Sequence, residues 1–404
     1  MKRRQFLFTV IVLTFGIAVI NGQSKETNTN IVSAEENDVE ESDFAIDKKG
    51  VLTEYYGTDE NVIIPDGVTE IGDYVFSGKD FSSILLPDSV TIIGEGVFSG
   101  CNKLTTITIP DSVTIIGEDA FSGCSSLNEI ILPDTITEIG DRTFADCSNL
   151  KEIIIPENII KIGDYAFSGC SSLTEIMIPN KVTTIGWSAF NNCKKLLSVT
   201  ISDTVEELGT MPFSGCSSLE KIIVDFNNKN YEIRENVLFK KEDFGLQLVA
   251  YPPKRKGKKY NIPEEVVSIE SSAFKDCKKL EKIVLSDNIT TIGYNAFSNC
   301  KKLIDITIPN NMTEIRYEKG SFYGGKNLKN LNITMKKGDK ISFVVVLGEG
   351  SELYRPTITY KNEKRIARQG NILDKEIITA KKKGKARIVF KYSESKTVVT
   401  LTIK

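Results

Sequence analysis

The sequence predicts an all-β fold, dominated by a solenoid of coils of about 23 residues with short parallel strands and followed by a small β-sandwich. Three observations carry this prediction. Phenylalanine recurs at a nearly fixed spacing, and cysteine recurs at the same spacing. Beyond residue 333 the period is lost, and short segments that alternate apolar and polar residues are separated by turn signals.

Two residue types that recur together set the repeat. The phenylalanines that recur with the repeat are Phe76, Phe98, Phe121, Phe144, Phe167, Phe190, Phe213, Phe274, Phe297 and Phe322. The cysteines are Cys101, Cys124, Cys147, Cys170, Cys193, Cys216, Cys277 and Cys300, and their gaps are 23 residues except for one of 61. A coil of this size cannot bury its own apolar face, so coils must stack and equivalent positions must form ladders.

Each coil is expected to start with a short strand. In the coil after Cys124, the recurring apolar residues Leu127, Ile130 and Leu132 are expected to point inward. Ile131, between the last two, is expected to point outward. Pro133 ends the strand because proline has no backbone N–H to donate to the ladder.

The second half of the same coil closes it. Ile136 and Ile139 are expected to form another short inward-facing element, after which Gly140 turns the chain. Phe144 then fills the coil, and Cys147 closes it as a small buried group. We assign the glycines of the recurring Ile-Gly and Ser-Gly pairs to turns of the repeat and not to a phosphate-binding loop.

The eight cysteines have two interpretations. In an exported chain they could form disulfides. Stacked positions, however, repeat about every 4.8 Å, whereas the Cβ atoms of a disulfide lie about 3.8 Å apart. The spacing therefore favours a ladder of buried free thiols, and the absence of any closely spaced cysteine pair argues against zinc.

The period is broken at two places. Residues 44–76 at the start of the repeats and about 225–263 between Cys216 and Cys277 both contain a Val-Leu pair and aromatic residues. We interpret the first as a hairpin that caps the open end of the solenoid, because an unpaired strand edge there would promote aggregation. We interpret the second as an inserted hairpin. The loop after the second carries Lys254, Arg255, Lys256, Lys258 and Lys259, which is either a solvated turn or a patch for an anionic partner.

The two ends of the chain differ in charge and hydropathy. Residues 1–34 begin with a basic stretch and a short apolar run, as in a signal peptide cleaved after Gly22 or Ala34, although an uncleaved signal anchor stays open. Residues 35–43 form an acidic linker. Residues 334–404 carry 17 Lys or Arg and 7 Asp or Glu, while the whole chain has a net charge of −3. The mature chain is therefore expected to be secreted or surface-associated, without a transmembrane segment.

The phrase I-P-x-x-V-T-x-I-G-x-x-A-F-x-x-C-x-x-L resembles the BspA-like, Treponema-type leucine-rich repeat of bacterial surface proteins, over residues 44–333. The resemblance implies a leucine-rich-repeat solenoid that adheres to extracellular matrix or to other cells. Residues 334–404 resemble, more weakly, a bacterial immunoglobulin-like domain of the type found with invasin and intimin.

Several classes of chemistry are excluded by composition. The chain has no histidine, which removes serine–histidine and cysteine–histidine nucleophiles and all histidine metal sites. No cofactor motif is present, and nucleic-acid binding is not expected because the repeats are acidic and no basic–aromatic module occurs. An acidic pair that cleaves polysaccharides stays an alternative, since Asp and Glu are plentiful.

The outward strand position offers a candidate protein-binding face. It is apolar at six places, namely Leu85, Ile131, Ile154, Met177, Ile223 and Val284. Exposed apolar stripes mark binding surfaces, although β-propensity or cover from a neighbouring loop would also explain this one. Trp187, the only tryptophan, is either an exposed turn residue or a contact anchor.

These observations predict a secreted, non-catalytic protein that binds an extracellular protein of a host matrix or a neighbouring cell. The basic region 334–404 could also bind an anionic polymer of the cell envelope. The alternative is an extracellular protein that binds or cleaves glycans.

Overall fold

The structure, a computed structural model, describes residues 43–307, 315–318, 330–335, 340–346, 357–361, 363–371, 375–380, 382–392 and 395–403. The expected signal peptide and all but the last residue of the acidic linker lie outside these residues. Within them, all regular secondary structure is β-strand except the short 3-10 helix η1 (Glu363–Arg365), so the all-β prediction is confirmed.

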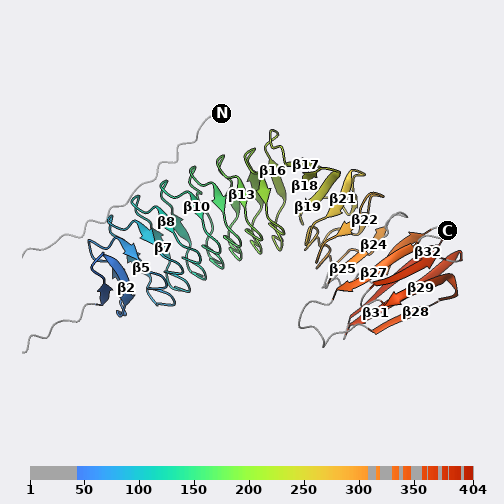
Figure 1. The fold of residues 1–404 in the computed structure, drawn as a ribbon, viewed down its shortest axis with the longest axis horizontal. Coiled ribbons are helices and arrows are strands. Elements are labelled where there is room, and N and C mark those ends of the chain that lie inside the picture. Colours follow the sequence, from blue (N-terminus) through green and yellow to red (C-terminus); the bar gives the residue numbers. More distant parts are fainter. Residues whose placement is uncertain are drawn as a thin grey trace, which may run out of the picture. The chain divides into compact units, whose positions relative to one another are not determined.

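One face of the solenoid is built from short parallel strands, one per coil (Figure 1). They are β3 (Asn61–Ile63), β5 (Ser83–Leu85), β7 (Thr106–Thr108), β9 (Glu129–Ile131), β12 (Glu175–Met177), β14 (Ser198–Ile201), β16 (Lys221–Val224), β20 (Lys259–Asn261), β22 (Lys282–Val284) and β24 (Asp305–Thr307). The strands pair in register, as in Ile107↔Ile130. Residues 152–154 hold the same place in the repeat between β9 and β12 without forming a strand.

A second set of shorter parallel strands follows the proline of each coil. It comprises β4 (Glu70–Ile71), β6 (Ile92–Ile93), β8 (Ile115–Ile116), β10 (Glu138–Ile139), β11 (Lys161–Ile162), β13 (Thr184–Ile185), β15 (Glu207–Leu208), β21 (Val266–Ile269) and β23 (Thr291–Ile292). At the start, β1 (Phe44–Ile46) and β2 (Val51–Tyr55) form an antiparallel hairpin, and β2 joins β4 in parallel. β8 and β10 are not paired, so this sheet is interrupted there.

A stack of aromatic rings fills the solenoid. The seven phenylalanines of the repeat from Phe76 to Phe213 are nearly parallel, with ring centroids 5.2–5.8 Å apart. Tyr55 extends the stack at its start, 5.0 Å from Phe76. After the interruption Tyr251 takes the place of the missing phenylalanine, 5.0 Å from Phe274. The rings are buried, and coil stacking therefore supplies the hydrophobic core that a single coil lacks.

The cysteines form a second ladder, and the interpretation as buried free thiols is confirmed. Each Sγ donates a hydrogen bond to a backbone carbonyl of the preceding coil, as Cys147 does to Phe121 at 3.1 Å. The longest such contact, 3.7 Å, joins Cys277 to Tyr251, where tyrosine replaces phenylalanine. The thiols therefore fix the position of one coil against the next.

The glycines of the two recurring pairs have different roles. In the Ser-Gly pairs, Gly123 and Gly169 have φ of 73° and 79°, as a left-handed turn position requires. The Ile-Gly glycines directly precede the turn, and their φ lies outside the left-handed region. A Cβ on Gly186 would instead lie 2.5 Å from the backbone N of Asp164, so glycine is needed where successive coils approach closely.

The long gap between Cys216 and Cys277 contains an antiparallel meander. It consists of β17 (Tyr231–Arg234), β18 (Val237–Glu242) and β19 (Gly245–Ala250), and β19 then pairs in parallel with β21. The buried apolar core divides here into two clusters, one on each side of the inserted strands. We call this division the seam.

The described residues beyond β24 form two four-stranded sheets. The first contains β25 (Ile315–Glu318), β27 (Lys340–Val346), β29 (Ile366–Asn371) and β30 (Lys375–Ala380). The second contains β26 (Asn330–Met335), β28 (Thr357–Lys361), β31 (Gly384–Tyr392) and β32 (Ser395–Ile403). An immunoglobulin-like fold for this region stays a prediction.

Candidate functional site

Parallel, in-register pairing places the central outward residues of successive strands side by side. Thr108 is paired with Ile131, and Met177 with Thr200. Inward neighbours such as Ile130 and Leu132 are buried, which forces the residue between them to the outside. We call this row the outward column; its members are Ile63, Leu85, Thr108, Ile131, Ile154, Met177, Thr200, Ile223, Asn261, Val284 and Thr307.

Most of the predicted apolar members of the outward column are uncovered. Ile154 is 81% exposed and Met177 is 74% exposed. Leu85, Ile131 and Ile223 are exposed as well, whereas Val284 is half-buried. Cover by a neighbouring loop, one of the two alternative explanations, therefore does not apply to the middle of the column within the described residues.

Ile63 is a member that the sequence reasoning missed. It is paired with Leu85 and is 67% exposed. The first gap between phenylalanines is 22 residues instead of 23, which obscures the alignment of this coil. The signal that could have found it is the phrase N-V-I-I-P, in which Ile63 lies two residues before Pro65, as Ile131 does before Pro133.

A row of carboxylates runs beside the apolar residues on the same face. Glu129, Glu152 and Glu175 occupy the other outward position of three successive coils, and all three are exposed. Like charges in neighbouring coils repel one another, so this row weakens the stacking of the coils slightly. The middle of the face therefore combines apolar contact area with negative charge.

The predicted basic loop is partly engaged inside the protein. The Arg255 guanidinium lies 5.3 Å from the ring centroid of Tyr251 and 5.0 Å from that of Tyr260. It also forms an ion pair with Glu235 at 2.7 Å and is 15% exposed. Arg255 thus ties the inserted strands to the following coil, and it is not available to an outside partner.

The lysines of this loop differ in their surroundings. The Nζ of Lys258 lies 2.9 Å from a carboxylate oxygen of Glu281. Lys254, Lys256 and Lys259 are exposed. Four of the five basic residues of the predicted patch are therefore exposed, one of them in an ion pair, and only Arg255 is held inside the protein.

Trp187 lies on a different side of the coil from the outward column, in the turn after β13. Its ring centroid is 5.0 Å from that of Tyr165, and its backbone N–H donates to Asp164 Oδ1 at 2.6 Å. Trp187 is 42% exposed. The two rings form a small aromatic surface in adjacent turns.

The titratable groups offer little for catalysis. Burial raises the pKa of Cys101 to about 12 and raises that of Cys147 as well, so these thiols stay protonated at neutral pH. Burial also raises the pKa of the Glu270 carboxyl, which accepts a hydrogen bond from the backbone of Ser271. No group of three potential metal ligands occurs among the described residues.

The chain is similar to a sequence family and to solved structures. The family described as BspA type leucine-rich repeat region matches in six copies over residues 55–170, 138–244 and 249–343. A leucine-rich cell surface protein from Faecalibacterium prausnitzii is 30% identical, with a TM-score of 0.63 over 72% of this chain and 86% of that chain. A leucine-rich repeat protein from Eubacterium ventriosum is 29% identical, with a TM-score of 0.51 over 58% and 62%. No curated protein matches significantly.

Among the residues that the structure describes, no helix is long and apolar enough to cross a lipid bilayer.

Proposed function

We propose, because this chain belongs to the BspA-type leucine-rich repeat family, that it is a secreted, non-catalytic adhesin whose outward column binds an extracellular protein. The structural relative from Faecalibacterium prausnitzii, itself described as a cell surface protein, supports a location outside the cell. The predicted signal peptide in residues 1–34 supports the same location.

The exposure of the outward column is the observation that carries this proposal. Large apolar side chains that stay exposed on a regular sheet are typical of protein-binding surfaces. The carboxylates of Glu129, Glu152 and Glu175 flank the apolar residues, so a partner with both apolar and basic side chains fits this face best. The partner class is therefore a protein surface of a host matrix or of a neighbouring cell.

Changing Ile131, Ile154 and Met177 to glutamate is expected to weaken binding to the protein partner by at least about a hundredfold, because contact area is lost and like charge is added. Binding of the purified protein to an array of matrix proteins and glycans measures this. A matched variant changes Ile115, Ile160 and Leu197 to glutamate, which adds the same charge on exposed apolar residues outside the column. Equal binding by the triple variant and the unchanged protein contradicts the proposal.

A glycan-binding function is the second candidate, and the aromatic surface of Tyr165 and Trp187 favours it. Trp187 is exposed and Tyr165 is half-buried beside it, and aromatic rings at a protein surface can stack against sugar rings. Glycan binding that survives the triple change but is lost in Trp187→Ala replaces the protein-binding proposal with this one. Turnover of a glycan, abolished by a single Asp or Glu substitution, points instead to a polysaccharide-cleaving enzyme.

We further propose that residues 334–404 hold the protein on an anionic polymer of the cell envelope. This region has a net charge of +10, whereas the rest of the chain sums to −13. Because salt screens exposed charges, with a Debye length of about 3 Å at 1 M, washing cells in 1 M NaCl is expected to release the protein. Immunoblots of the wash and of the cell pellet measure the release. Retention in the pellet at that salt concentration rules out purely electrostatic attachment.

A further inference from the structure

Regular coils of the solenoid are joined by three backbone hydrogen bonds in the turn around each ring of the stack. In one turn the N–H groups of Ser188, Phe190 and Asn192 donate to carbonyls of the following coil, at 3.0, 3.0 and 2.7 Å. The accepting carbonyls belong to Thr210, Pro212 and Ser214. The same pattern recurs from coil to coil, so each turn offers three N–H groups to the next coil and three carbonyls to the previous one.

At the seam this pattern stops. The equivalent donors of the next turn are the N–H groups of Met211, Phe213 and Gly215, and none of them has a hydrogen-bond partner among the described residues. In a trans peptide the C=O and N–H groups point in opposite directions. Since Thr210, Pro212 and Ser214 direct their carbonyls at the previous coil, these three N–H groups must point across the seam.

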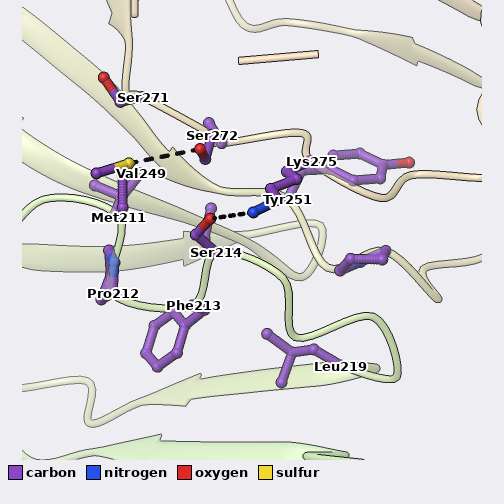
Figure 2. A pocket seen from close by; sticks show the side chains of 13 residues that line it. Met211, Pro212, Phe213, Ser214, Leu219, Val249, Tyr251, Ser271, Ser272 and Lys275 are labelled. Atoms are coloured by element: carbon purple, nitrogen blue, oxygen red, sulfur yellow. Dashed lines mark hydrogen bonds between the residues drawn. The ribbon is translucent and has the colours of Figure 1, made fainter. Parts of the chain in front are cut away.

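A pocket adjoins this turn (Figure 2). One wall is the turn of Met211, Pro212, Phe213 and Ser214, and the opposite wall includes Ser272 and Lys275. The pocket has a volume of about 20 Å³ and is open to solvent. This is enough for a group of water size, since about 10–15 Å³ suffices for one water.

The pocket also carries a positive charge. The ammonium of Lys275 donates a hydrogen bond to Ser214 Oγ at 3.1 Å, which holds it at the wall and leaves two of its three protons for another acceptor. The hydroxyl of Ser272 contacts Met211 Sδ at 3.6 Å, a weak acceptor. None of the described residues that line the pocket is acidic. The charged and hydroxyl side chains that line the pocket can therefore all donate a hydrogen bond, and a negatively charged oxygen is the matching acceptor.

We propose that the seam pocket binds a carboxylate group, such as an acidic side chain, a chain terminus or a sugar acid presents. One carboxylate oxygen enters the enclosed space and accepts from the N–H groups of Phe213 and its neighbours, while the Lys275 ammonium balances its charge. Convergent backbone N–H groups bind anions in this manner elsewhere in proteins. The small enclosed space favours a planar carboxylate over the bulkier phosphate.

The first test is a titration of the isotopically labelled mature protein with sodium acetate, against sodium chloride and sodium phosphate at the same ionic strength and pH. Saturable downfield shifts of the amide resonances of Met211, Phe213 and Gly215 with acetate are expected. The amides of Phe190 and Asn192 serve as an internal control, because they already donate to the next coil. Equal shifts with chloride, shifts only with phosphate, or no saturable shift overturn the carboxylate assignment.

A pair of variants tests the charge. Lys275→Met keeps the length of the side chain and is expected to weaken acetate binding about tenfold, as the loss of one charge-assisted hydrogen bond does. Lys278→Met removes an exposed charge from the same turn and is expected to leave binding unchanged. Both spectra must otherwise superimpose on that of the unchanged protein, which shows that the fold is kept. Equal acetate affinity in the two variants contradicts the role of Lys275.

Discussion

Replacing Phe167 by alanine is expected to lower the free energy of unfolding by about 3–5 kcal/mol, the usual cost of emptying a large aromatic site in a core. Phe167 is fully buried, with ring centroids of its neighbours Phe144 and Phe190 at 5.4 and 5.5 Å. Its N–H donates to Ala189 at 2.8 Å and its carbonyl accepts from Cys193. These bonds hold the coil in place, so the cavity cannot close by collapse.

The position of Phe167 within the array increases the effect. In a solenoid each coil is stabilised by the interfaces on its two sides, and an internal ring contributes to both. The free energy of unfolding is measured by urea and thermal denaturation of the purified protein. Phe244→Ala is the matched control, because this phenylalanine is 92% exposed and its removal is expected to change stability by less than about 0.5 kcal/mol. A similar loss in both variants means that the ring stack does not hold the coils together.

The ladders could be predicted because they depend only on spacing. A residue type that returns every 23 positions must occupy the same place in each coil, so the burial of Phe144 and Cys147 followed directly from the pattern. The alternation around Ile131 gave the direction of its side chain in the same way. These predictions needed no knowledge of how the turns run.

The roles of Gly186 and Arg255 depend on contacts between coils, and spacing alone cannot reveal them. A glycine occurs both where φ is positive and where two backbones approach closely, so the pattern Ile-Gly does not separate these causes. Arg255 appears in the sequence as one of five basic residues in a loop. Only the fold brings the ring centroids of Tyr251 and Tyr260 to 5.3 and 5.0 Å from its guanidinium group.

The seam pocket could not be predicted from residue spacing either. Its donors are backbone groups of Met211, Phe213 and Gly215, which carry no sequence signature. What distinguishes them is the absence of acceptors on the next coil, and this follows from the path of the inserted strands β17 to β19. The sequence could locate the insertion between Cys216 and Cys277, but not the hydrogen bonds that it interrupts.

Gly186→Ala and Gly140→Ala are expected to differ in stability by about 3 kcal/mol, although the two glycines occupy the same place in the repeat. At Gly186 a Cβ would lie 2.5 Å from backbone atoms of Asp164 and Gly163, which cannot give way without moving a coil. The N–H of Gly186 donates to Ile162 at 2.8 Å, and that bond would lengthen. Overpacking of this kind costs about 1–3 kcal/mol and occasionally more.

At Gly140 the nearest atoms to a Cβ are Thr143 Oγ1 at 3.3 Å and backbone atoms of Glu118 at 3.5 Å. The wider spacing agrees with the unpaired strands β8 and β10 at this point of the array. Alanine at this position reduces the conformational entropy of the unfolded chain and does not clash in the folded one. It is therefore expected to raise the free energy of unfolding, by no more than about 1 kcal/mol. Urea denaturation midpoints of the two variants measure the difference. Equal midpoints would mean that the coils separate freely at Gly186 and that glycine is not required there by close approach.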